Sequence, residues 1–314
     1  MKIVALLLAF CLAFPVDACV WVKGTTKEGK ATRVSGFGPA RHLEWEFRNS
    51  IKTDLAVEGR ALVDGHRTAT SVYDRNDYAV GLMYLGRAAE AVTYLEKIEA
   101  ELPGDYHVAA NLGTALELSG RNTEAKKWIE EGIRRNPDSH FGTEWLHVAI
   151  LDAKIKQDSD PQYFNHHSVL NIDYQTLQTG AKEIPLLGQK RDLRELTKAL
   201  RYQLTERLKF VKGKDPVVAS LLFDYAAIEA GTSTLESAIG LLKLAAEYGY
   251  PSSRIEPLLA SYSRTIQIAT WKTRLYIASG IAAFIALIAY AIRRRWIFVK
   301  RPTQPTASPA PLAT

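Results

Sequence analysis

Cysteine is scarce in this chain, with only Cys11 and Cys19 among 314 residues. Cys11 lies inside the first apolar run, and Cys19 follows that run directly. Removal of the run as a leader would leave one cysteine, which excludes an internal disulfide from the mature chain. The stability of the fold must then come from the packing of side chains.

The sequence also lacks the short motifs that mark common active sites. It contains no Gly-x-Ser-x-Gly, His-Glu-x-x-His or Walker-type motif, and the cysteine that survives leader removal stands at the chain terminus. Gly36-Phe37-Gly38 precedes Pro39 and has no third glycine, so it is not a dinucleotide-binding fingerprint. We therefore expect no enzyme activity, no catalytic residue and no cofactor.

Histidine stands near acidic or polar residues at two places that could suggest a metal site. His140, Glu144 and His147 have helical spacing, but carboxylate metal sites draw on two Glu-x-x-His elements, and the chain offers one. The run at 165–167 carries two histidines, with no second histidine or cysteine cluster at ligand spacing. We favour a structural role for the first group and predict no metal site.

Positive charge is concentrated outside the body of the chain. The formal net charge is +6. Six basic residues account for it, one near the start and five after the last apolar run: Lys2, Arg293, Arg294, Arg295, Lys300 and Arg301. Residues 3–292 are therefore neutral, and we expect no nucleic-acid binding.

The chain begins with the pattern of a secretory signal peptide. Lys2 precedes an uncharged run over residues 3–14, and small residues allow cleavage after Ala18. An uncleaved anchor is the alternative, but 12 residues rise about 18 Å against a hydrocarbon core of about 30 Å. Ala18-Cys19 also resembles the lipobox of bacterial lipoproteins, although Asp17 departs from that pattern. The prediction is a signal peptide at 1–18, with lipidation of Cys19 left open.

A second apolar run near the C-terminus predicts a single membrane span. Residues 275–292 carry no charge, and Trp271 and Trp296 flank them at the interface level. Five basic residues follow the run and two precede it, so the positive-inside rule places the C-terminus in the cytoplasm. We predict a transmembrane helix at 271–296 and a short proline-rich cytoplasmic tail at 297–314. The N-terminal domain is then periplasmic or extracellular.

The middle of the chain repeats itself with a period of 34 residues. Five residue pairs share this separation: Leu82 and Leu116, Gly86 and Gly120, Ala91 and Ala125, Leu95 and Ile129, and Pro103 and Pro137. The pairs resemble the tetratricopeptide repeat (TPR). In that family small residues let paired helices touch, glycine opens the turn between them, and proline ends the second helix. The resemblance predicts an all-α fold, a TPR-type helical-hairpin solenoid, with the repeats in 71–173.

The flanking regions are predicted to be helical as well. Residues 19–70 should form an N-terminal cap over the apolar end of the solenoid. Residues 174–270 should form a helical extension, in which 215–251 reads as a divergent TPR-like hairpin. An amphipathic helix is expected at 192–211, with basic residues such as Arg191, Arg194 and Arg207 on the face away from its leucine stripe. That basic face is either solvated or a dock for an acidic partner or anionic lipid.

The resemblance to TPR proteins also implies a concave groove that binds a segment of a partner. Carried over from the repeat register, the predicted partner-binding residues are Asn76, Val80, Met83, His107, Asn111, Thr114, Glu117 and Glu144. The family's carboxylate clamp requires basic residues and asparagines, of which only Asn111 is present. The expected function is that of a membrane-anchored scaffold for a protein or peptide partner. The alternative is a structural subunit of a membrane complex, whose span makes specific contacts through Gly280 and its alanines.

Overall fold

The computed structural model describes residues 21–35, 42–172, 177 and 182–299. The predicted signal peptide, Cys19 and most of the predicted tail lie outside the described residues. Internal contacts divide the chain into two units, Met1–Ile266 and Gln267–Thr314. Each unit is described by itself.

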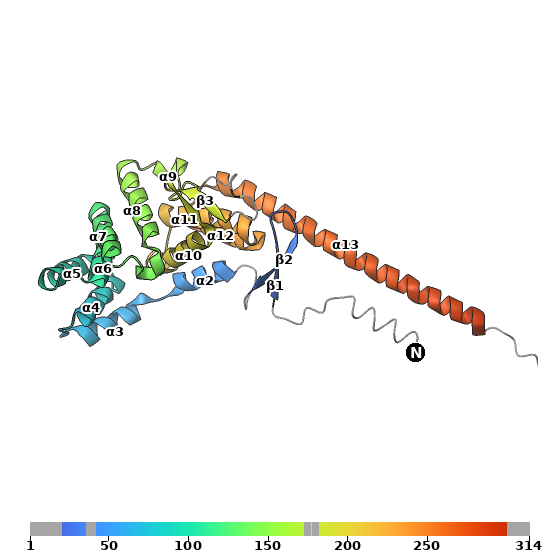
Figure 1. Cartoon of the computed structure of the whole chain (residues 1–314), viewed down its shortest axis with the longest axis horizontal. Helices are drawn as coiled ribbons and strands as arrows, with labels where there is room; N and C mark the ends of the chain where they lie inside the picture. Colours follow the sequence, from blue (N-terminus) through green and yellow to red (C-terminus); the bar gives the residue numbers. More distant parts are fainter. Residues whose placement is uncertain (1–20, 36–41, 173–176, 178–181, 300–314) are drawn as a thin grey trace, which may run out of the picture. The chain divides into compact units, whose positions relative to one another are not determined.

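The described residues contain twelve α-helices, a short 3₁₀ turn and two β-hairpins (Figure 1). This confirms the prediction of an all-α helical-hairpin solenoid. The helices before the C-terminal one are α2 (His42–Lys52), α3 (Leu55–His66), α4 (Val72–Tyr84), α5 (Ala88–Glu101), α6 (Tyr106–Leu118), α7 (Asn122–Arg135), α8 (Glu144–Ser159), α9 (Tyr163–His166), α10 (Leu193–Phe210), α11 (Pro216–Thr232) and α12 (Leu235–Glu247). The turn η1 is Ser139–Gly142, and the strands are β1 (Trp21–Thr25), β2 (Ala31–Ser35), β3 (Glu183–Leu186) and β4 (Gln189–Asp192).

Helices α4 to α7 form two consecutive hairpins, which follow the 34-residue period. Ser71 and Asp105 cap α4 and α6, because their side chains accept hydrogen bonds from free backbone N–H groups of the first turn. Gly86 and Gly120 end the first helix of each hairpin at φ 74° and 78°, a left-handed conformation that glycine adopts without a Cβ clash. The repeated glycines thus set the same tight turn twice.

A continuous apolar core holds these hairpins together. The small Ala91 and Ala125 are fully buried and let the paired helices approach closely, while Leu95 and Ile129 fill the space beside them. Leu151 of α8 belongs to the same core. The hairpins therefore continue into α8 without a break in the packing. We call α4 to α8 the repeat block.

Helix α8 contributes to two cores. Leu151 packs into the repeat core, whereas Leu146 and Ile150 pack into a second core formed mainly by α10, α11 and α12. We call α10 to α12 the C-terminal block. Short α9 follows α8, and the C-terminal block covers the face that a second helix of the repeat would have covered.

The N-terminal region divides between the two blocks. Helix α3 packs on α4, as a cap should, but α2 packs on α10 and α12. Leu43 and Phe47 of α2 belong to the core of the C-terminal block. Strand β1 pairs with β2 in an antiparallel hairpin, and the Thr25 hydroxyl donates to Glu236 of α12 at 2.8 Å.

The second unit is helical as far as residue 299. This helical part is the C-terminal portion of α13 (Ser252–Val299). Helix α13 contains an apolar window of mean hydropathy 2.2, and none of the residues in that window is buried. This is the one helix among the described residues that is long and apolar enough to cross a membrane. The span predicted at 271–296 lies within α13.

We expect Gly81→Ala to lower the free energy of unfolding by about 1–3 kcal/mol, because a new methyl group overpacks this site. A Cβ at Gly81 would lie 2.8 Å from Leu62 Cβ and 3.0 Å from the backbone oxygen of Gly59, where α3 crosses α4. Gly65→Ala is the matched control. Nothing lies within 4 Å of its Cβ position, so this change should be neutral or slightly stabilising. Urea denaturation followed by circular dichroism compares the two variants.

Candidate functional site

The first helices of the repeats line one side of an internal cavity of about 190 Å³. Helices α4, α6 and α8 contribute from the repeat block, and α10 closes the opposite side. Six of the eight residues predicted to face the groove line this cavity: Val80, Met83, Asn111, Thr114, Glu117 and Glu144. The structure therefore brings most of the predicted groove together, but with α10 lying against it.

Glu117 anchors α10 to the repeat block. Its carboxylate is buried and accepts hydrogen bonds from Arg207 of α10 through Nη1 at 2.7 Å and Nη2 at 3.1 Å. Lys154 of α8 donates to the same carboxylate at 3.0 Å. Two cations, Arg207 through a two-point contact and Lys154, thus compensate the buried charge.

His147 connects Glu117 to a second buried carboxylate. Its Nε2 lies 2.7 Å from Glu117, and its Nδ1 lies 3.2 Å from Glu144. Both ring nitrogens face carboxylate oxygens, so both act as donors and the ring is an imidazolium. The Glu144 carboxylate also lies 2.7 Å from His140 Nδ1 and accepts a hydrogen bond from the Gln203 side-chain amide at 3.3 Å. A chain of charged hydrogen bonds therefore crosses the interface of α6, α8 and α10.

The pKa values of these groups shift in the directions that the pairing requires. Burial alone would raise the pKa of Glu117, but the Arg207 charge and the His147 hydrogen bond outweigh it, so this pKa lies well below 4.5. Burial also acts to raise the pKa of Glu144, but His140 and His147 lower it overall. Burial would lower the pKa of His147, yet the two carboxylates raise it above 6.5. The pairing therefore favours the ionised form of both carboxylates and the protonated form of the His147 ring.

The backbone at the edge of the network is strained. His140 and Phe141 both adopt left-handed conformations, with φ 48° and 64°, which are uncommon for residues with a Cβ. The His140 ring stacks on Tyr202 at 5.4 Å between centroids, in addition to its bond with Glu144. These contacts hold the turn between α7 and α8 in place.

The two remaining predicted residues lie outside the cavity. Asn76 is buried, and its Oδ1 accepts a hydrogen bond from Asn111 Nδ2 at 3.0 Å. The His107 side chain is 39% exposed and lies 3.2 Å from Asp105. Its ring meets Tyr73 edge to face at 5.7 Å, and Tyr73 itself is 64% exposed. We call the Tyr73–His107 contact the open end of the groove, because neither residue lines the cavity against which α10 lies.

Sequence reasoning missed the partners that α10 supplies. The sequence pattern places Arg207 on a basic face that is either solvated or docks an external partner. In the structure its guanidinium instead donates hydrogen bonds to Glu117 of the same chain. Arg191 of the same face stacks on Trp145, with 3.6 Å between its guanidinium carbon and the ring centroid. Gln203, one turn before Arg207, is also buried, which shows that this face of α10 is covered.

A wider hollow of about 990 Å³ lies on the other side of α10, lined by α2, α10 and α11. Arg201 crosses it to pair with Glu46 at 2.6 Å. Lys198 lies over the exposed Phe141 ring at 5.2 Å from the centroid. Acidic, basic and apolar side chains therefore all line this hollow.

Neither hollow presents the chemistry of a resident metal or cofactor among the described residues. The carboxylate of Glu117 is already engaged by Arg207, Lys154 and His147, and Glu144 is engaged by two histidines. A metal ion would have to displace the cations from these carboxylates. The arrangement instead fixes α10 against the repeats.

Comparison with known protein families identifies the repeat. Residues 82–142 match the tetratricopeptide repeat family. The match begins inside α4 and extends to the turn before α8, and it agrees with the 34-residue period. No curated protein matches the chain. The TPR repeats indicate a role in protein–protein interaction.

The network predicts a pH dependence of stability that originates in His147. A group whose pKa is raised in the folded state stabilises the fold fully below its unfolded pKa, near 6.5, and the contribution is lost as the pH rises through the folded pKa. The free energy of unfolding should therefore fall as the pH rises above about 6.5. His147→Gln should remove this part of the pH dependence, because glutamine does not titrate.

Urea denaturation at a series of pH values measures the effect, with His166→Gln in the short α9 as the control. The control should keep the wild-type profile. A wild-type profile in His147→Gln would show that the imidazolium does not couple to folding.

Proposed function

We propose that this chain is a membrane-anchored TPR scaffold that binds a partner protein or peptide on the extracytoplasmic side of the membrane. The TPR match supports a protein-binding role, and the apolar window of α13 supports an anchor. The signal pattern over residues 1–18 and the basic residues after the span support the orientation. No convergent catalytic group among the described residues favours an enzyme.

The observation that carries this proposal is the uneven occupancy of the groove. Helix α10 covers the part that contains Glu117 and Glu144, where the side chains are satisfied inside the chain. The open end keeps Tyr73 and His107 exposed, and tyrosine is enriched among residues that dominate binding energy. We therefore infer that the partner contacts the open end of the groove, next to the hydrogen-bonded Asn76–Asn111 pair.

A photo-crosslinking amino acid at position 73 should capture the partner in its native membrane, because Tyr73 projects from the open end. Trp45 of α2 is the matched control, since it is an aromatic residue of nearly equal exposure, 65% against 64%. We expect a specific crosslinked product from position 73 and none from position 45, measured by mass spectrometry of the purified adducts. Equal capture at the two positions, or none at position 73, would contradict the proposed surface.

The alternative role is a structural subunit whose transmembrane helix makes specific contacts. Gly280 and the alanines between Ala278 and Ala291 would permit close packing of another helix. Replacing residues 275–292 with an unrelated apolar helix separates the two roles in the same crosslinking assay. A scaffold keeps the product at position 73, whereas a subunit held by its span loses it.

The proposed topology predicts the sides from which two positions react. In a background with both native cysteines replaced by alanine, Val57→Cys should react with a membrane-impermeant maleimide in intact cells or spheroplasts, because Val57 is 62% exposed in the extracytoplasmic domain. Ser308→Cys in the tail should react only after lysis. Mass-tagged gel shifts report both reactions. The reverse pattern would place the TPR repeats in the cytoplasm.

A further inference from the structure

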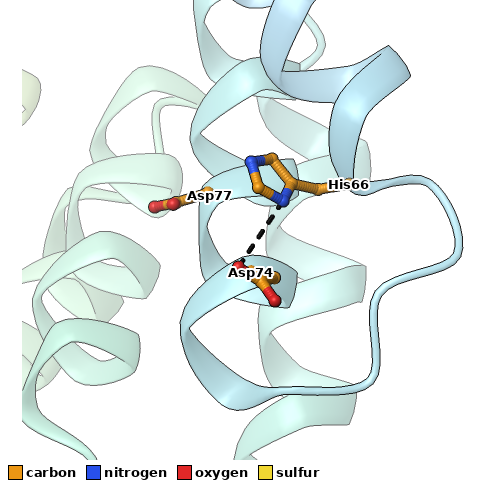
Figure 2. A group of neighbouring side chains, drawn as sticks. All are labelled: His66, Asp74 and Asp77. Atoms are coloured by element: carbon orange, nitrogen blue, oxygen red, sulfur yellow. Dashed lines mark ion pairs between the residues drawn. The ribbon is translucent and has the colours of Figure 1, made fainter.

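We propose that His66, Asp74 and Asp77 form a binding site for a divalent transition-metal ion, with Zn²⁺ as the best fit. One ligand atom from each residue lies within 4.8 Å of the others. Figure 2 shows the His66 ring turned toward Asp74, with Asp77 further along the same helix as Asp74. The proposal stands independently of the proposed function.

Two helices bring the three side chains together. His66 is the last residue of α3, and Asp74 lies in the first turn of α4. Asp77 follows Asp74 by three residues, so the two carboxylates are neighbours on one side of α4. His66 Nδ1 lies 3.7 Å from Asp74 Oδ1. The site therefore spans the connection between α3 and α4.

The three ligand atoms need to move only slightly closer together to bind one ion. Zinc bonds to nitrogen and oxygen of about 2.0–2.2 Å place tetrahedral ligand atoms roughly 3.4 Å apart. The ligand atoms, which lie within 4.8 Å of one another, must therefore approach by no more than somewhat over an ångström. All three residues are half-buried, so the helices hold their stems while rotations of the side chains move the ligand atoms.

The local charge favours a cation. Two carboxylates lie near one imidazole, and Asp77 makes no hydrogen bond or ion pair with any other residue in the described part of the chain. The neighbouring cations are engaged elsewhere, since Arg75 pairs with Glu101 at 2.7 Å and Arg67 with Asp64 at 3.4 Å. The negative charge of the site is therefore not neutralised by an arginine.

Asp74 is already oriented for this role. Its Oδ2 accepts a hydrogen bond from the Ser71 hydroxyl at 2.7 Å, which leaves Oδ1 on the His66 side. Metal-binding carboxylates are commonly fixed by such a hydrogen bond from an outer residue. One nitrogen and two oxygens suit Zn²⁺ better than Ca²⁺ or Mg²⁺, which prefer oxygen alone. A fourth position stays open for water or an incoming ligand.

Zinc titration of the full chain tests the site. The untagged protein, in detergent micelles and stripped with a chelator, is titrated with ZnCl₂ by isothermal calorimetry. We expect one ion per chain. Asp77→Asn and His66→Gln should each weaken the affinity at least tenfold, because each removes one of three ligands. Asp77→Asn keeps the side-chain shape and breaks no contact, so circular dichroism should show an unchanged fold.

The matched control is His107→Gln. His107 also lies beside an aspartate, at 3.2 Å, but it is not part of a three-residue group, so its loss should leave zinc affinity unchanged. Absence of zinc binding by the wild-type chain, or unchanged affinity in Asp77→Asn and His66→Gln, would overturn the proposal. Loss of binding in a His166→Gln, His167→Gln double variant alone would also overturn it, by assigning the ion to that loop.

Discussion

The structure depends on how it compensates one buried carboxylate. Glu117 lies where α6, α8 and α10 meet, and it receives Arg207, Lys154 and His147. A carboxylate in this position is costly without partners, and each of its partners comes from a helix other than its own. The pairing therefore specifies which helices meet and in what alignment. A neutral side chain at this site would leave Arg207 buried against no counter-charge.

Because Glu117 binds α10, that helix lies against part of the concave face of the TPR repeats. The concave face is normally available to a partner along its length, as the resemblance implied. Here α10 of the C-terminal block covers the part that contains Glu117 and Glu144, whereas Tyr73 keeps 64% and the His107 side chain 39% of its surface exposed.

The sequence was informative wherever structure follows from local spacing. Gly86 and Gly120 repeat because a left-handed turn strongly favours glycine, and the helix expected at 192–211 agrees with α10, Leu193–Phe210. Long-range pairing left no such periodic trace. The contact of Arg207 with Glu117 joins residues 90 positions apart, and the cluster at His66 combines two helices across a turn. Neither sequence separation recurs along the chain, so the sequence pattern predicts neither contact.

The split of the N-terminal region governs the order in which the chain can fold during synthesis. Helix α2 emerges early, yet Phe47 packs against Tyr225, with 6.2 Å between ring centroids, and Arg48 binds Glu247. Its partners are therefore translated only after the whole repeat block. The hairpins of the repeat block rest mainly on local contacts and can close beforehand. Leu43 and Phe47 of α2 therefore stay uncovered until α10 to α12 have been synthesised.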